Sequence, residues 1–236
     1  MVLLLISIMA MGIGENIRTS FDFAKGGLVG HWGRWLGLII LCIIPIVNFI
    51  FPLGYCVRIY NGGDEAPELD DWLRLFVDGL QLFLINIVYM IVPFFLIVTG
   101  IVTLIFGMVG GIVLTRIDFD FSGMFLAFFA MIGLILLLVG VILAIACCLI
   151  STMGCIRFAR MDSLGEAFNF SEITAKITEI GWGSYILAYL VLVIITSLIV
   201  GILAVIPVVG WLLTFIIIPL FLIWQAKYFE NIYSLG

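Results

Sequence analysis

The sequence contains few charged residues: Asp, Glu, Lys and Arg make up 11% of its 236 residues, and His31 is the only histidine. A soluble domain carries roughly 25% charged residues, so this composition excludes one. The formal net charge of −5 also excludes the basic surface that binds nucleic acid. Hydrophobic residues make up 65% of the chain. We therefore expect a single membrane domain, residues 1–236, with no nucleic-acid partner.

Residues that carry out catalysis are equally scarce. The long apolar runs contain no carboxylate, the chain has no histidine pair, and no serine or cysteine lies beside a base. The five cysteines lack the spacing of a metal site, and we interpret them as small buried apolar residues: Cys42, Cys56, Cys147, Cys148 and Cys155. The sequence therefore predicts a protein that is not an enzyme, with no catalytic residue, metal or cofactor.

Four apolar runs are long enough to form full transmembrane helices, which need about 20 residues each. In the first run we expect a span over about 81–106, tilted or bent near Pro93, and a break at the glycines that follow. Glycines at four- and seven-residue spacing are typical of close helix contacts, and two such pairs occur: Gly107 with Gly111, and Gly133 with Gly140. The other three spans are expected over residues 124–150, 185–205 and 212–228.

A fifth apolar run lies between Arg34 and Arg58, and it contains two prolines and an asparagine. As one kinked span it would give five transmembrane helices; as a re-entrant hairpin it would have both ends on one side. The single span divides the ten basic residues six to four between the two sides, whereas the hairpin places nine on one side and leaves Arg116 alone. Because Lys and Arg gather on the cytoplasmic side, we predict the hairpin, with both termini cytoplasmic.

Two polar segments have the composition of interfacial helices. Residues 15–34 and 161–181 combine basic residues with aromatic ones, as segments at the level of the lipid headgroups do. Ser163 and Glu166 fit a capping box at the start of the second segment. Residues 1–13 are apolar but too short to span as a helix, so they are either a mis-set start or a short apolar lead-in.

A third polar segment is the acidic loop over residues 60–78, which we also predict to be cytoplasmic. Asp64 is a candidate N-cap for a short amphipathic helix that would include Leu69 and Phe76. The fold prediction is therefore an all-α integral membrane protein with four transmembrane helices, one re-entrant Pro-containing hairpin and two to three interfacial amphipathic helices. Three tryptophans are predicted to anchor the interfacial segments: Trp32, Trp72 and Trp182.

Similar motifs occur twice, in the same order, along the chain. SFDFAK resembles AFNFSE, a Trp-Gly pair follows each of them, and IPIVNF then resembles IPVVGW. This order predicts an internal two-fold repeat with halves at about 15–106 and 123–230. By this comparison, three prolines are predicted to form hairpin turns: Pro45, Pro52 and Pro207.

The run GHWGRWLGLIILCIIPIVNFIFPLGYCVRIYNGGDEAPELDDWLRLFVDG resembles an archaeal family of multi-pass membrane proteins, frequent in methanogens and catalogued as a domain of unknown function. The resemblance extends from about Gly14 over nearly the whole chain, including EAFNFSEITAKI and the IPVVGW turn. It implies a location in the cell membrane and an archaeal origin. It implies no activity.

Two functions are compatible with these features. The scarcity of polar groups at membrane depth favours a membrane scaffold, assembly or lipid-interface protein, whose partners are membrane lipids and either partner membrane proteins or further copies of the chain. The alternative is a small-solute transporter or channel that uses the Pro/Asn hairpin near the midplane. Asn48 and Asn86 would then be intramembrane or pore contacts; otherwise such residues hydrogen-bond helices together.

Overall fold

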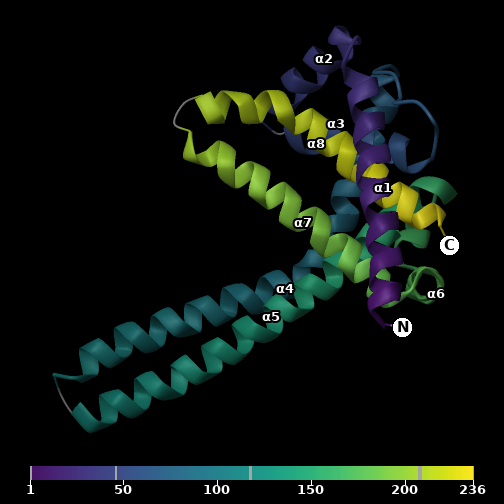
Figure 1. The fold of residues 1–236 in the computed structure, drawn as a ribbon. Coiled ribbons are helices and arrows are strands. Elements are labelled where there is room, and N and C mark those ends of the chain that lie inside the picture. The colour runs from purple at the N-terminus through teal and green to yellow at the C-terminus, as the bar shows by residue number, and fades with distance from the viewer. Residues whose placement is uncertain (1, 46, 117–118, 207–208, 236) are drawn as a thin grey trace. The chain divides into compact units, whose positions relative to one another are not determined.

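A computed structural model describes residues 2–45, 47–116, 119–206 and 209–235. These residues form helices and contain no strand, which confirms the predicted all-α fold (Figure 1). In chain order the elements are α1 (Val2–Leu28), α2 (Trp32–Ile43), α3 (Val47–Tyr60), α4 (Trp72–Leu114), α5 (Phe119–Met161), a short 3-10 helix (Leu164–Phe168), α6 (Phe170–Ile180), α7 (Trp182–Val205) and α8 (Val209–Ser234).

Four helices are long and apolar enough to cross a membrane: α4, α5, α7 and α8. They confirm the four predicted transmembrane helices and show a multi-pass membrane protein. A fifth span arises only if α1 and α2, which are bent by 100° at the break between them, are counted together. The stretch between Arg34 and Arg58 is not one continuous helix, because α2 ends at Ile43 and α3 begins at Val47.

The chain divides into two compact units: residues 1–85 with 150–236, and residues 86–149. The second unit is a helical hairpin of α4 and α5, whose contact is lined by glycine. A Cβ atom on Gly107 would lie 2.6 Å from Cβ of Phe129, and one on Gly140 would lie 3.0 Å from the backbone nitrogen of Ile97. The predicted glycine contacts therefore exist. The predicted break at Gly107, Gly110 and Gly111 is wrong, because α4 continues through all three to Leu114: close helix packing outweighs the low helix propensity of glycine.

In the first unit, α8 is the central helix and contacts α1, α2, α3 and α7. Hydrogen bonds from long side chains reinforce this packing. The hydroxyl of Tyr228 donates to the carbonyl of Ala188 (3.0 Å), and the indole of Trp224 donates to the carbonyl of Ile17 (3.2 Å). Such bonds help hold helices together in lipid, where apolar burial alone supplies no driving force between them.

Helices α2 and α3 pack against each other as a hairpin, and α3 crosses the start of α4 at two glycines. A Cβ on Gly54 would overlap the carbonyl oxygen of Leu75, and a Cβ on Gly79 would overlap that of Ile50. Neither glycine was singled out by the sequence. The reciprocal contact fixes the hairpin to the beginning of α4.

The predicted prolines have different places in the fold. Pro45 lies in the turn between α2 and α3, as expected for a hairpin turn. Pro52 lies inside α3 and is not part of that turn. Pro207 lies outside the described residues.

Two predicted helix starts are wrong. The acidic loop stays irregular until α4 begins at Trp72, so Asp64 does not cap a helix and Leu69 lies outside one. The side chain of Arg58 donates hydrogen bonds to the loop carbonyls, so they are satisfied without a helix. Ser163 makes no side-chain capping bond, and the Glu166 side chain, the other half of the predicted capping box, pairs with Arg157. Helix α6 is capped by the side chain of Asn169, which accepts from the backbone N–H of Glu172 (3.4 Å).

Candidate functional site

The acidic loop between α3 and α4 is held in place by two side chains at the end of α3. Arg58 donates to the backbone carbonyls of Glu68 (2.9 Å), Asp70 (2.8 Å) and Asp71 (3.2 Å), and also pairs with the carboxylate of Asp70. The hydroxyl of Tyr55 donates to the carbonyl of Pro67 (2.7 Å). An irregular segment needs such donors for its carbonyl groups, and α3 provides them.

The bend between α1 and α2 at residues 29–31, which we call the elbow, brings the end of α1 and the start of α2 against the same loop. Nη1 of Arg34 donates to the carbonyl of Gly27 (2.9 Å), which ties α2 back to the end of α1. Gly27 lies so close to Ala66 that a Cβ would overlap its side chain, and a Cβ on Gly37 would lie 3.0 Å from Cδ1 of Leu69. Both ends of the Arg34–Arg58 stretch therefore contact one loop, as a hairpin requires and as a single straight span does not allow.

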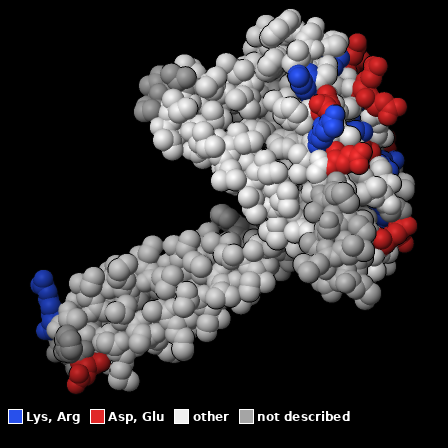
Figure 2. Space-filling model, viewed as in Figure 1, with Lys and Arg blue, Asp and Glu red and all other residues white. Residues whose placement is uncertain are grey.

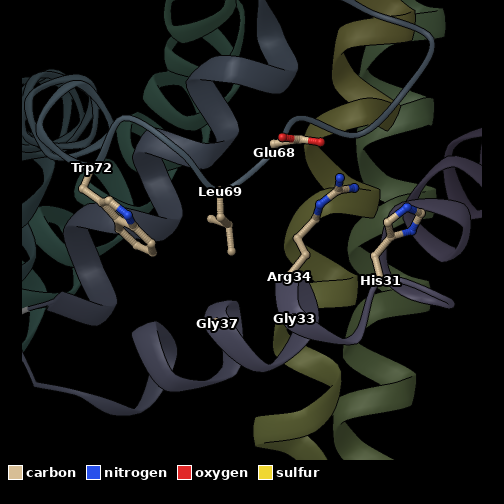
Figure 3. Close-up of a pocket in the computed structure, with 7 residues that line it drawn as sticks. All are labelled: His31, Gly33, Arg34, Gly37, Glu68, Leu69 and Trp72. Carbon is tan, nitrogen blue, oxygen red and sulfur yellow. The ribbon is translucent and has the colours of Figure 1, made fainter.

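A cavity of about 430 Å³ lies between the elbow and the loop. Figure 3 shows a separation of chemistry along it: the ring of Trp72 and the side chain of Leu69 form one end, and Glu68, Arg34 and His31 lie toward the other. Gly33 and Gly37 of α2 lie beneath the opening. We call this cavity the elbow pocket. Its lining is His31, Gly33, Arg34, Gly37, Glu68, Leu69 and Trp72.

A second cavity of about 400 Å³ shares His31 and Arg34 with the elbow pocket. It is rich in acids, since Asp22, Asp64 and Glu65 also line it. No ion pair involves Arg34 or the carboxylates of Asp64, Glu65 and Glu68 among the described parts of the chain. The elbow therefore presents one guanidinium group among several carboxylates that are free to bind a ligand.

Other charges of the first unit are paired with each other. The carboxylate of Glu230 is 4% exposed and accepts from Nη2 of Arg160 (2.7 Å), Nζ of Lys227 (2.8 Å) and Oγ of Ser234 (2.9 Å). Lys227 also donates to the carbonyl of Gly63 (2.9 Å), which joins α8 to the acidic loop. Figure 2 shows the charged side chains of this unit gathered along one side. Glu230, Arg160 and Lys227 therefore have a structural role, because each of them finds partners inside the unit.

Glu230 was not identified from the sequence. The only available signal is its position three residues after Lys227, at the end of an apolar helix. Arg157 likewise contacts two groups of opposite charge. Its Nε donates to the carboxylate of Glu166 (2.6 Å), and its Nη2 lies 3.6 Å from the carboxylate of Glu172 in α6.

The two asparagines predicted as pore contacts belong to different units, so their pairing in a pore stays a prediction. Asn48 lies in the first turn of α3, and its buried Oδ1 has no hydrogen-bond donor among the described residues. Pro52 also lacks the N–H that would donate to the backbone carbonyl of Asn48 four residues earlier. Asn86 is half-buried in α4 and has an interaction partner of its own. Neither asparagine lines the elbow pocket.

The three tryptophans predicted as interfacial anchors have large exposed fractions: 63% for Trp32, 50% for Trp72 and 40% for Trp182. Trp32 stacks on Trp35, with ring centroids 5.5 Å apart, and Trp72 lines the elbow pocket. Their contact with lipid headgroups stays a prediction. Across the described ranges, no cluster of His, Cys, Asp and Glu has the arrangement needed to hold a metal ion.

Comparison with known proteins gives one match. The model of a family described as "Protein of unknown function (DUF4013)" matches residues 37–215, from α2 into α8. The match is shorter than the predicted resemblance, which began at about Gly14. No curated protein and no solved structure matches the chain.

Proposed function

We propose that this chain organises lipids and partner proteins at one face of the membrane. The chain belongs to the family of unknown function named above, because the family model matches residues 37–215 and so covers most of its length. In this proposal it is a scaffold or lipid-interface protein and not an enzyme. The observation that carries the proposal is the elbow pocket, in which exposed aromatic and apolar groups lie next to unpaired charged groups. Pockets with this division of chemistry suit lipid headgroups.

The rigidity of the surrounding structure supports a binding role. Arg58 and Tyr55 fix the loop that forms one wall of the pocket, and Arg34 fixes the elbow that forms the other. The loop is further tied to α8 by Lys227. A site held on both sides by hydrogen bonds loses little conformational entropy when a ligand binds.

The distribution of charge gives the proposed orientation. Nine of the ten Lys and Arg residues belong to the first unit, and Arg116 alone belongs to the second, in the turn that follows α4. By the positive-inside rule, the acidic loop 60–78 and both termini face the cytoplasm. The α2–α3 hairpin then enters the membrane from that side and returns to it.

The proposal also includes an internal repeat, which the order of the helix breaks supports. It keeps the archaeal origin that the resemblance implies. Helices α2 and α7 both begin at a tryptophan, Trp32 and Trp182, directly after a short break. They end at Ile43 and Val205, in each case before an Ile-Pro pair. A duplicated unit of interfacial helix, Trp-Gly and apolar hairpin explains this order.

A second function is favoured by one observation, the buried Oδ1 of Asn48 without a donor. Buried polar groups in membrane proteins are usually paired, and an unpaired acceptor in a Pro-containing hairpin is a feature of solute sites. In this alternative the chain transports a small solute that donates a hydrogen bond to Asn48. Elsewhere, polar residues bond to each other: Nε2 of Gln225 lies 3.4 Å from Oγ1 of Thr196.

Two measurements on the full chain distinguish these functions. Purification from native membranes tests the scaffold: a partner protein or lipid recovered at fixed stoichiometry, with no solute flux or ion current after reconstitution in vesicles, is the expected result. A flux or current that Asn48→Ala abolishes would overturn the proposal and establish transport. Asn61→Ala, at an exposed position just after α3, is the matched control.

A further inference from the structure

We propose that the elbow pocket binds one phospholipid whose headgroup carries both a phosphate and a primary ammonium group. The phosphate binds Arg34, the ammonium binds Glu68, and an acyl chain leaves past Leu69 and Trp72. This inference deepens the proposed function and rests on it in placing the elbow at the membrane interface.

The phosphate half of the site is Arg34. A guanidinium group has five N–H donors, and the bond from Nη1 to the carbonyl of Gly27 uses one of them. That bond fixes the direction of the side chain, which points from α2 toward the loop (Figure 3). The remaining donors are available for a planar, bidentate interaction with phosphate oxygens, the geometry for which arginine is well suited. His31 lies beside it in the same cavity.

The ammonium half of the site is Glu68. Its backbone carbonyl is held by Arg58, so its position is fixed, while its carboxylate has no ion-pair partner among the described residues. Arg34 and Glu68 line one cavity without being paired to each other. A zwitterionic headgroup can bridge two such groups, with its positive end on the carboxylate and its negative end on the guanidinium.

The surrounding charge selects a zwitterionic lipid over an anionic one. Asp64 and Glu65 line the adjoining cavity; both are exposed, and neither has an ion-pair partner in the described parts of the chain. Their carboxylates oppose the net negative charge of an anionic headgroup bound at Arg34, because like charges in adjoining cavities repel each other. An ammonium group compensates that repulsion. A primary ammonium also donates hydrogen bonds to Glu68, which a quaternary choline group cannot do.

The apolar end of the pocket provides the exit for the acyl chain. Trp72 is 50% exposed, and on α2 the apolar side chains of Leu36 and Ile40 are 57% and 56% exposed. Gly33 and Gly37 leave the floor of the pocket without side chains. A chain can therefore pass from the headgroup over α2 to the surface that faces lipid.

Two substitutions test the site while keeping the fold. A Cβ on Gly33 meets no atom within 4 Å, so a side chain can start there without a clash, and Gly33→Leu places an apolar group in the pocket lining while favouring the helix. Glu68→Gln removes the negative charge but keeps the backbone carbonyl that Arg58 uses. Glu15→Gln is the matched control, because Glu15 is exposed, has no ion-pair partner among the described residues and lines neither of the two cavities.

The experiment is native mass spectrometry of the full chain in detergent, titrated with dioleoyl phosphatidylethanolamine, phosphatidylcholine or phosphatidylglycerol. We expect one phosphatidylethanolamine to bind with the highest affinity and phosphatidylglycerol with the lowest. Glu68→Gln should weaken phosphatidylethanolamine binding about tenfold, the loss of one charge-assisted hydrogen bond. Gly33→Leu should remove the bound lipid, and Glu15→Gln should change its affinity less than twofold.

Equal affinity for the three lipids, or equal effects of Glu68→Gln and Glu15→Gln, would overturn the inference. Binding of free phosphoethanolamine as tightly as the lipid would overturn the role of the acyl chain. These readouts are separate from the flux and partner measurements. A solute flux would refute the proposed scaffold function, but the lipid titration would still test the elbow pocket. If no lipid binds in the titration, the lipid site is refuted, but a partner protein recovered at fixed stoichiometry would still support the scaffold function.

Discussion

Arg58 provides the sharpest test of how the acidic loop is held. Arg58→Met keeps the length of the side chain and removes its donors to three loop carbonyls, at 2.8–3.2 Å. At about 1 kcal/mol for each bond, opening of the loop becomes easier by about 3 kcal/mol. The ion pair with Asp70 adds little, because that carboxylate is 71% exposed. Because 1.4 kcal/mol corresponds to a factor of ten, the open population rises about a hundredfold.

Limited proteolysis of the purified chain measures this opening, with a protease that cleaves after glutamate. Glu65 and Glu68 lie in the loop, so cleavage there reports how often it leaves the site. Arg74→Met is the matched control, since the Arg74 side chain is 62% exposed and lies 3.8 Å from its partner. Cleavage of Arg58→Met at the rate of the unaltered chain, or of the control, would refute the loop-anchoring role of Arg58.

Three further substitutions test the packing, each by thermal or denaturant unfolding in detergent. Gly54→Ala should lower the free energy of unfolding by about 1–3 kcal/mol, because the added Cβ overlaps the start of α4. Gly33→Ala is the control and should not lower it, because a Cβ there meets no atom within 4 Å. Equal effects of the two substitutions would contradict the α3–α4 crossing. Asn48→Leu should stabilise the chain by about 1 kcal/mol by removing a buried acceptor without a donor, and a loss of stability would show that a partner satisfies it. Glu230→Gln should cost about 2–4 kcal/mol, since two largely buried cations lose their carboxylate; an unchanged midpoint would refute that network.

The transmembrane helices could be predicted because apolar length is a local property of the sequence. Helices α4, α5, α7 and α8 follow directly from runs that are too long and too apolar to be anything but spans. The bend of the Arg34–Arg58 stretch at Pro45 could also be predicted, since proline cannot continue the hydrogen bonding of the preceding helix.

The contacts between distant residues could not be predicted in this way. The Gly54–Gly79 crossing joins two glycines that have no shared pattern in the sequence, and Glu230 resembles any acid at the end of a span. The acidic loop shows the same limit. The spacing of Leu69 and Trp72 fits a helix, but donors from Arg58 stabilise an irregular path that propensity does not reveal.

The central claim is that the Arg34–Arg58 stretch is a hairpin whose two ends lie on the same side of the membrane. Single cysteines at Val29 and Asp64, both exposed, test it in a chain whose five native cysteines are replaced, with Arg116→Cys as the reference for the opposite side. An impermeant maleimide added to sealed vesicles should label positions 29 and 64 from one side and position 116 from the other. Labelling of positions 29 and 64 from opposite sides would contradict the hairpin and the cytoplasmic elbow pocket together.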